Sequence, residues 1–107
     1  MGERINRPAI RIVLAPLARY NSKINRDRGI SLYGMQQGRT VYIDPRTVNP
    51  VSTYIHEKCH MDHPDWAEEQ VEAFEHQWWT TASWREKAEI LILLGRAEIK
   101  DSKEVIG

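Results

Sequence analysis

The sequence predicts an α+β domain in which a small antiparallel sheet of about three strands precedes three helices. In the first half of the chain, short apolar segments alternate and are rich in β-branched residues, as strands are. In the second half, apolar residues recur at helical spacing, and two capping motifs mark helix starts. The length of 107 residues suits one hydrophobic core. We therefore expect residues 1–107 to form a single domain of the minimal zincin-like type.

The expected strands are separated by turn residues. Residues 10–14 alternate in polarity and form the first predicted strand. Residues 30–33 and 40–44 are predicted to be two further strands. The glycine-containing segment 34–38 between them suits a hairpin connection. Pro45 ends the last of these strands, because proline cannot donate to the ladder of a sheet.

The first expected helix covers residues 51–62. Val51, Ile55 and Cys59 follow one another at four-residue intervals and so share one face of a helix. Pro64 then breaks the pattern, because proline removes a backbone donor. Cys59 is therefore expected to be a small buried residue on this face, and not a metal ligand or a nucleophile.

Two capping boxes predict the later helices. Asp65 and the glutamate three residues later open a helix that continues to about Trp79. Ser83 and the glutamate three residues later open another, which ends at Gly95. The charged tail, residues 96–107, is expected to be a short helix or a frayed end.

The overall charge excludes some classes of partner. Lysine plus arginine equals aspartate plus glutamate at 15 each, so nothing suggests a surface that neutralises the phosphates of a nucleic acid. No apolar run approaches the length of a membrane span, and the charged N-terminus lacks a signal-peptide pattern. Cys59 is the only cysteine, which fits a reducing compartment. A cytoplasmic protein without nucleic-acid or membrane partners is expected.

The strongest functional signal is the HExxH motif His56-Glu57-Lys58-Cys59-His60. Residues four apart lie one above the other on a helix, so both imidazoles can reach one metal ion. The Glu57 carboxylate can then take a proton from a water molecule on that metal. The motif falls in a segment that is predicted to be helical, and three of the four histidines lie within eight positions. We therefore expect Zn²⁺ as the cofactor and Glu57 as the catalytic base.

The third metal ligand is open between several residues. Glu68 is preferred because it lies beside the buried side of its helix and nearest the turn back from His60. Alternatively, Glu68 binds no metal and only completes the capping box with Asp65. His63 is an alternative ligand, although a continued helix would place it almost two turns beyond His56. Glu72, one turn after Glu68, could hydrogen-bond a ligand imidazole. Further acidic candidates on the same helix are Glu69 and Glu75.

These motifs together resemble the gluzincin metallopeptidases, in particular their smallest members, the minigluzincins. In that group an HExxH helix is followed by a second helix that carries a glutamate ligand and an acidic residue four positions later. Glu68 and Glu72 match that pair. The resemblance covers about residues 40–80. It implies hydrolysis of peptide bonds in a peptide or protein substrate.

The resemblance also implies how substrate binds and how activity is controlled. The family has a rim strand that aligns substrate antiparallel, and Val41, Tyr42 and Ile43 lie in the matching segment. It is known for latency, so the tail 96–107 could lie over the cleft. Two other hypotheses remain open. One is a zinc-stabilised interaction module without turnover, and the other is a latent or regulatory protease that acts on one specific protein.

Overall fold

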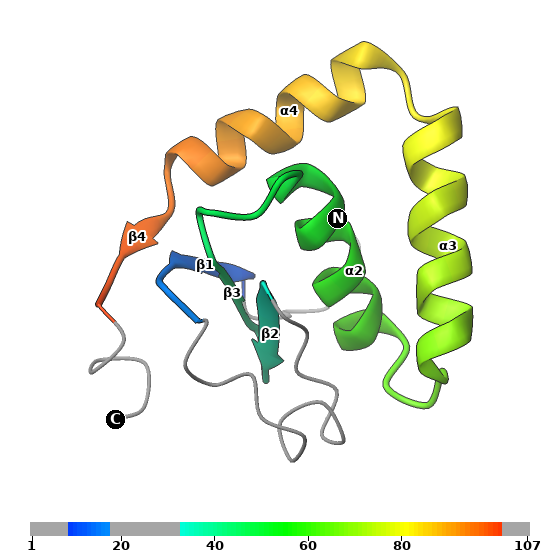
Figure 1. Ribbon diagram of the computed structural model, residues 1–107, viewed down its shortest axis with the longest axis horizontal. Coiled ribbons are helices and arrows are strands. Elements are labelled where there is room, and N and C mark those ends of the chain that lie inside the picture. Colours follow the sequence, from blue (N-terminus) through cyan, green and yellow to red (C-terminus); the bar gives the residue numbers. More distant parts are fainter. Residues whose placement is uncertain (1–8, 18–32, 102–107) are drawn as a thin grey trace, which may run out of the picture.

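The computed structural model describes residues 9–17 and 33–101, and all structural statements below concern these residues. They form four strands and three helices (Figure 1). In chain order the elements are β1 (Arg11–Leu14), β2 (Gly34–Gln37), β3 (Thr40–Ile43), α2 (Pro50–Asp62), α3 (Glu68–Thr81), α4 (Trp84–Gly95) and β4 (Glu98–Ile99). The predicted α+β class is confirmed, with strands in the first half of the chain and helices in the second.

The sheet is mixed rather than antiparallel throughout. Its strand order is β2-β3-β1-β4, with β3 antiparallel to β2 but parallel to β1. The antiparallel prediction holds for the β2–β3 hairpin alone. Parallel neighbours need a crossover of a dozen or more residues. Leu14 and Gly34 both lie at the Ile43 end of the sheet, so it is β2 that returns the chain to the end where β3 begins.

The hairpin is displaced from the segments predicted for it. Strand β2 begins at Gly34, within the segment expected to be the turn, and the connection is Gly38 and Arg39. Gly38 has φ 58°, which suits the first central position of a two-residue type II′ turn. Of the predicted strand 30–33, only Tyr33 is described, and it precedes β2. Pairing with β3 therefore decides the position of β2, although its own residues have little strand preference.

Helix α2 has clear local signals at both ends. Pro50 occupies the first turn, where its missing N–H costs nothing, and the Asn49 side chain accepts a hydrogen bond from the Ser52 amide at 3.0 Å. At the other end, the His63 amide donates to the Cys59 carbonyl oxygen. The helix therefore ends at Asp62, as the prediction of residues 51–62 required.

Helix α3 begins two residues later than predicted. Its first residue is Glu68, and Ala67 occupies the N-cap position. The Gln70 side chain accepts a hydrogen bond from the Ala67 amide at 2.8 Å. Asp65 does not cap this helix because it lies within the turn that connects α2 to α3. Glu68 is consequently not engaged in the predicted capping box, and its carboxylate is available to α2.

Helix α4 and the tail complete the fold. The predicted capping box is confirmed: the Ser83 hydroxyl accepts from the Glu86 amide, and the Glu86 carboxylate accepts from the Ser83 amide. After α4, the tail forms β4, which is parallel to β1 and places Glu98 opposite Val13. The Glu98 carboxylate forms an ion pair with the Arg11 guanidinium. The expectation of a helix or frayed end is therefore wrong up to Asp101. Residues 102–107 lie outside the described residues.

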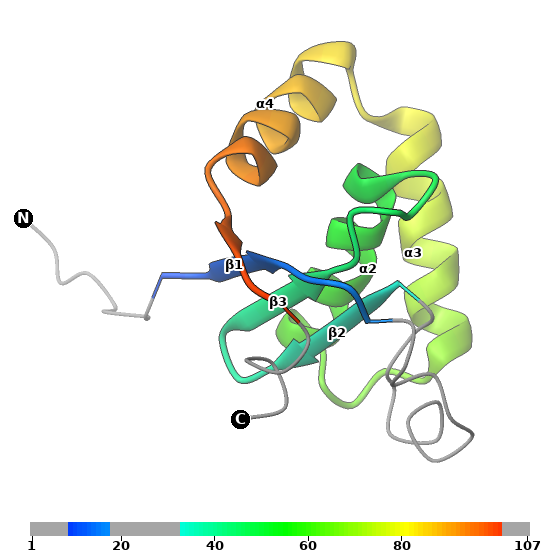
Figure 2. The ribbon, with the colours of Figure 1, turned by 60° about the vertical axis from the view of Figure 1, so that its left-hand side comes forward.

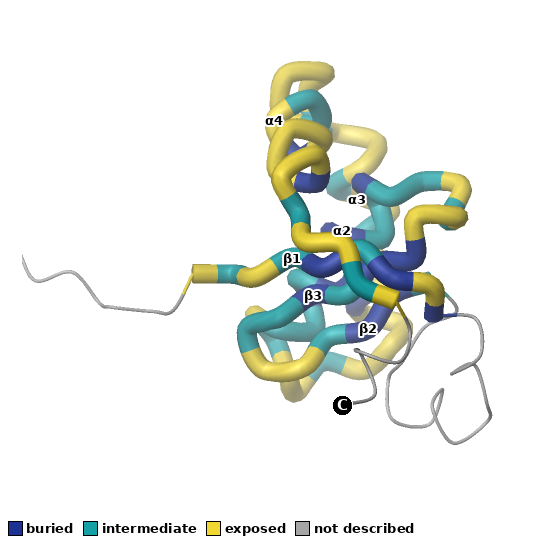
Figure 3. Tube along the Cα trace, turned by 90° about the vertical axis from the view of Figure 1, so that its left-hand side faces the viewer, coloured by how far each residue is buried: buried dark blue, intermediate teal, exposed yellow. Residues whose placement is uncertain are grey.

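Helix α2 lies between the sheet and α3, and α4 crosses its N-terminal half (Figures 1 and 2). One core cluster joins Val41 and Ile43 to apolar residues of α2 and α4. A second, smaller cluster around Val13 covers the opposite face of the sheet. Figure 3 shows that α2 is largely buried, whereas most of α4 is exposed. None of the described helices combines the length and the apolar character that a membrane crossing requires.

Candidate metal centre

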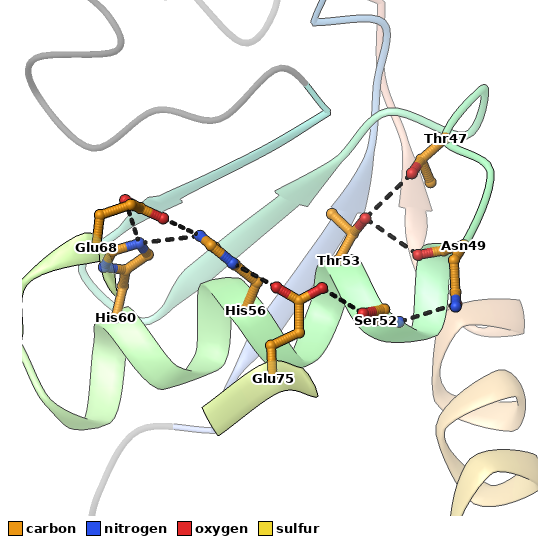
Figure 4. Close-up of polar contacts among 8 residues, drawn as sticks. All are labelled: Thr47, Asn49, Ser52, Thr53, His56, His60, Glu68 and Glu75. Carbon is orange, nitrogen blue, oxygen red and sulfur yellow. Dashed lines mark hydrogen bonds and ion pairs between the residues drawn. The ribbon is translucent and has the colours of Figure 1, made fainter. Parts of the chain in front are cut away.

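The two histidines of the HExxH motif face each other on α2. Their Nε2 atoms are 3.2 Å apart, and the rings meet edge to face with centroids 4.9 Å apart (Figure 4). This geometry follows from the four-residue spacing, which stacks side chains on one helix face. Both side chains are at most 15% exposed. The predicted pair therefore presents two nitrogen donors to one point.

Glu68 brings a carboxylate to the same point from the neighbouring helix. Its Oε1 lies 2.6 Å from His56 Nε2, and its Oε2 lies 3.3 Å from His60 Nε2 (Figure 4). One donor atom from each of the three side chains lies within 4.8 Å of the other two. The short turn between α2 and α3 causes this convergence, because it reverses the chain and places the first turn of α3 beside the last turns of α2. Two imidazoles and one carboxylate form a donor set that zinc prefers.

Glu75 orients the His56 ring. Its Oε1 lies 2.7 Å from His56 Nδ1, and its Oε2 accepts a hydrogen bond from the Ser52 hydroxyl (Figure 4). A carboxylate at Nδ1 favours the tautomer that carries its proton there, which directs the Nε2 lone pair towards Glu68 and His60. This is the contact that a metal-ligating histidine usually makes.

Glu72 was expected to be able to hydrogen-bond a ligand imidazole, but the carboxylate at His56 Nδ1 is that of Glu75. Glu72 is exposed on α3, whereas Glu75 is partly buried against α2. At 100° per residue, Glu75 is only about 20° from Glu68 around the helix after two turns, and Glu72 is about 40° away on the other side. The seven-residue spacing was therefore the signal that identifies Glu75.

Charge around His56 favours its protonated form when no ion is present. Burial of the ring opposes the charge, but the hydrogen bond to Glu75 and the nearby charges of Glu57 and Glu68 raise the pKa of His56 to about 9. The same contact lowers the pKa of Glu75, against the effect of its burial. A metal ion would replace that proton, since only neutral imidazole is a ligand.

Glu57 is completely buried beside the donor group. It lies against the first residue of β2. A Cβ atom added to Gly34 would be 2.7 Å from Glu57 Oε2 and 2.9 Å from its Cγ, closer than side chains approach. The carboxylate thus occupies space that only glycine leaves. Sequence reasoning placed Gly34 in a turn, and nothing local in the sequence indicates this contact.

His63, the alternative ligand, is not part of the group. It follows the end of α2, and its ring stacks on Trp66 with centroids 3.8 Å apart and an angle of 8° between the planes. Of the described residues, the three that join the group are His56, His60 and Glu68. The helix ends before His63 can be turned towards them.

The expectation that Val41, Tyr42 and Ile43 form the rim strand is wrong. They form β3, which is paired with β2 on one side and with β1 on the other. Val41 and Ile43 are also completely buried. A central strand has no free backbone groups for a substrate. Within the described part of the sheet, β2 is the edge strand nearest Glu57.

Comparisons of the chain with protein-family models, with curated proteins and with solved structures found no match. The functional argument therefore depends on the geometry of the site and on the chemistry of its residues.

Proposed function

We propose that this protein is a zinc-dependent metallopeptidase in which His56, His60 and Glu68 hold the ion and Glu57 is the general base. The observation that carries the proposal is the convergence of three donor groups from two helices within 4.8 Å of one another. Their side chains match the two-histidine, one-glutamate set of catalytic zinc sites in peptidases. The resemblance of the motif and of the following helix to the minigluzincins supports the same activity.

The number of donors favours a catalytic site over a structural one. Structural zinc sites are closed by four protein ligands, whereas catalytic sites keep a position for water or substrate. The described residues supply three donors to the group, and His63 is engaged with Trp66 instead. The interaction-module hypothesis needs a fourth protein ligand. It is therefore the weaker of the two.

Each side chain has a separate role in the proposed reaction. Zinc, when bound, supplies a lowered pKa for water and polarisation of the scissile carbonyl group. Glu57 accepts a proton from the attacking water and later donates it to the leaving amine. Its complete burial strengthens the electrostatic interactions on which this transfer depends. Glu75 keeps the His56 ring in position throughout.

An extended peptide is the substrate that the fold accommodates best. Strand β2 borders the site, and its outer edge has no partner strand among the described residues. A peptide can add to such an edge through backbone hydrogen bonds. This assigns to Gly34–Gln37 the role that was expected of Val41 to Ile43. A reducing, cytoplasmic location, inferred from the single buried cysteine, belongs to the same proposal.

The test combines metal analysis with turnover of a casein-type substrate. The purified protein should bind one zinc ion per chain and hydrolyse the substrate. Glu57→Gln should keep the zinc and lose activity by at least about a hundredfold, as expected for loss of a general base. Glu69→Gln, on the exposed side of α3, is the matched control and should change neither property. Full activity of Glu57→Gln, or a wild-type protein that binds no zinc, would refute the proposal.

A further inference from the structure

A concave site lies on the side of α2 that is turned away from His56 and His60. It is an open cavity of about 400 Å³ between α2, α3 and α4. At 100° per residue, Tyr54, Lys58 and Asp62 point away from His56 and His60, so the two sites share a helix but not a face. The lining residues that matter most are Tyr54, Phe74, Trp78, Asp62, Glu86 and Glu89.

The walls of this cavity are mainly apolar and aromatic. Tyr54 contributes a buried ring from α2, and Phe74 and Trp78 contribute rings from α3. Ile90 adds an aliphatic surface from α4. Phe74 remains 40% exposed, so part of its ring is accessible from the cavity mouth or the solvent. The cavity volume lies within the range of small-molecule sites.

The rim of the cavity carries an excess of negative charge. Asp62, Glu86 and Glu89 line it, and Lys58 is the only lysine or arginine among the lining residues. Lys58 Nζ lies 2.6 Å from Asp62 Oδ2, so its charge is already paired. Glu86 and Glu89 add two further carboxylates to the lining from α4.

Glu86 remains ionised at neutral pH. It accepts a hydrogen bond from the Ser83 amide, and its own amide donates to the Ser83 hydroxyl. These contacts lower the pKa of Glu86. Its charge is thus held at the N-terminal end of α4. No lysine or arginine in the described part of the chain forms an ion pair with it, so it can attract a cation into the cavity.

We propose that this cavity binds a small lipophilic ammonium cation. The aromatic rings attract a cation through their negative faces, the carboxylates complement its charge, and the apolar walls cover its hydrocarbon part. The volume suits a small molecule rather than a length of peptide chain. This inference uses none of the residues proposed to bind zinc, so it stands or fails independently of the peptidase activity.

The test compares three probes of different charge, each built on a straight six-carbon chain, on the intact protein. These are hexyltrimethylammonium, 1-hexanol and hexanoate. Binding is followed by the NMR signal of the Trp78 indole N–H, assigned with a Trp78→Phe variant. The cation should shift this signal saturably and bind about tenfold more tightly than the alcohol, with hexanoate the weakest. Equal affinities for the alcohol and the cation would overturn the proposal, as would shifts confined to other tryptophans.

A pair of variants locates the charge effect. Glu89→Gln should weaken binding of hexyltrimethylammonium by about threefold and leave 1-hexanol unchanged. Glu69→Gln, an exposed glutamate of α3 that does not line the cavity, should change neither affinity. An equal loss in both variants would indicate a general field effect and would refute a local site. Shifts of Trp78 on simple dilution would show that a second copy of the chain occupies the cavity, which would also refute it.

Discussion

At the scale of single residues, the contact between Glu75 and His56 is the one on which we expect the affinity of the proposed zinc site to depend. The carboxylate receives the Nδ1 proton at 2.7 Å and is itself held by Ser52. Glu75→Gln should therefore lower zinc affinity by about 10–100-fold, the usual cost of losing such a partner. Competition with a chelator of known affinity measures this.

Glu72→Gln provides the control for that experiment, because Glu72 is an exposed carboxylate on the same helix. It should leave zinc affinity unchanged. If Glu72→Gln proved as damaging as Glu75→Gln, the contact at Nδ1 would not be the cause.

The contact between Gly34 and Glu57 is equally local in its consequences. Gly34→Ala places a methyl group 2.7 Å from Glu57 Oε2 and 2.9 Å from the Thr53 methyl group. The expected loss of unfolding free energy is about 1–3 kcal/mol, as for overpacking elsewhere. In a Glu57→Ala background the same change should cost clearly less, because the displaced carboxylate is absent. Urea unfolding of all four proteins measures the coupling, and strict additivity would contradict a direct clash.

At the scale of elements, Asp44 secures the loop between β3 and α2 and so helps to set where α2 begins. It is completely buried, accepts a hydrogen bond from the Leu17 amide at 2.9 Å, and pairs with the Arg46 guanidinium at 2.7 Å. The Arg46 side chain is the largest influence that lowers the pKa of Asp44, to about 2, against the effect of burial.

This shift predicts how stability depends on pH. The pKa of Asp44 is lower in the folded than in the unfolded chain. Its contribution to the free energy of unfolding is therefore fully present above the unfolded pKa, near 3.8. It should be lost as the pH falls towards 2. Asp44→Asn should be about 1–3 kcal/mol less stable than the wild type at pH 7. The difference should narrow below pH 4 in urea unfolding experiments. A constant difference from pH 7 to pH 2 would contradict this assignment.

The pairing of elements also explains why the expected substrate strand was wrong. Val41 to Ile43 have the composition of a strand, and the composition of Gly34 to Gln37 is poor by comparison. In the sheet, however, the better strand lies in the centre and the poorer one lies at the edge. Edge or central position depends on which segments pair, and local preference does not encode it.

At the scale of the whole molecule, the proposed ion would connect α2 to α3, which are otherwise joined by packing and by the contacts of Glu68 and Glu75. Binding to the folded state alone stabilises it by about 2.7 kcal/mol when free zinc is a hundred times the Kd. We expect the Tm to rise on the order of 10 °C with zinc and to return with a chelator. Differential scanning calorimetry measures this.

Two histidine variants make the same experiment specific. His60→Ala should abolish the rise in Tm, because it removes one of the three donors. His63→Ala should retain the rise, since His63 stacks on Trp66 outside the group. If His63→Ala also lost the response, His63 would be a ligand and the three-donor site would be incorrect.

The sequence by itself determined the features that depend on neighbours within a few residues. The HExxH pair converges because four residues make about one helical turn, and Ser83 caps α4 through a motif three residues long. The α+β class follows from the same local periodicities. Glu68 could be preferred among several candidates, because it comes first on its helix, nearest the turn back from His60.

Only the tertiary structure decided the features that join distant segments. The parallel pairing of β1 with β3, the edge position of β2, the choice of Glu75 over Glu72 and the space that Gly34 leaves for Glu57 all belong to this class. Each depends on the packing of two elements, which sets the rotation of one against the other. A difference of a few tens of degrees around α3 decides whether a carboxylate faces solvent, as that of Glu72 does, or contacts the His56 ring, as that of Glu75 does. Local propensity does not specify an angle of that size.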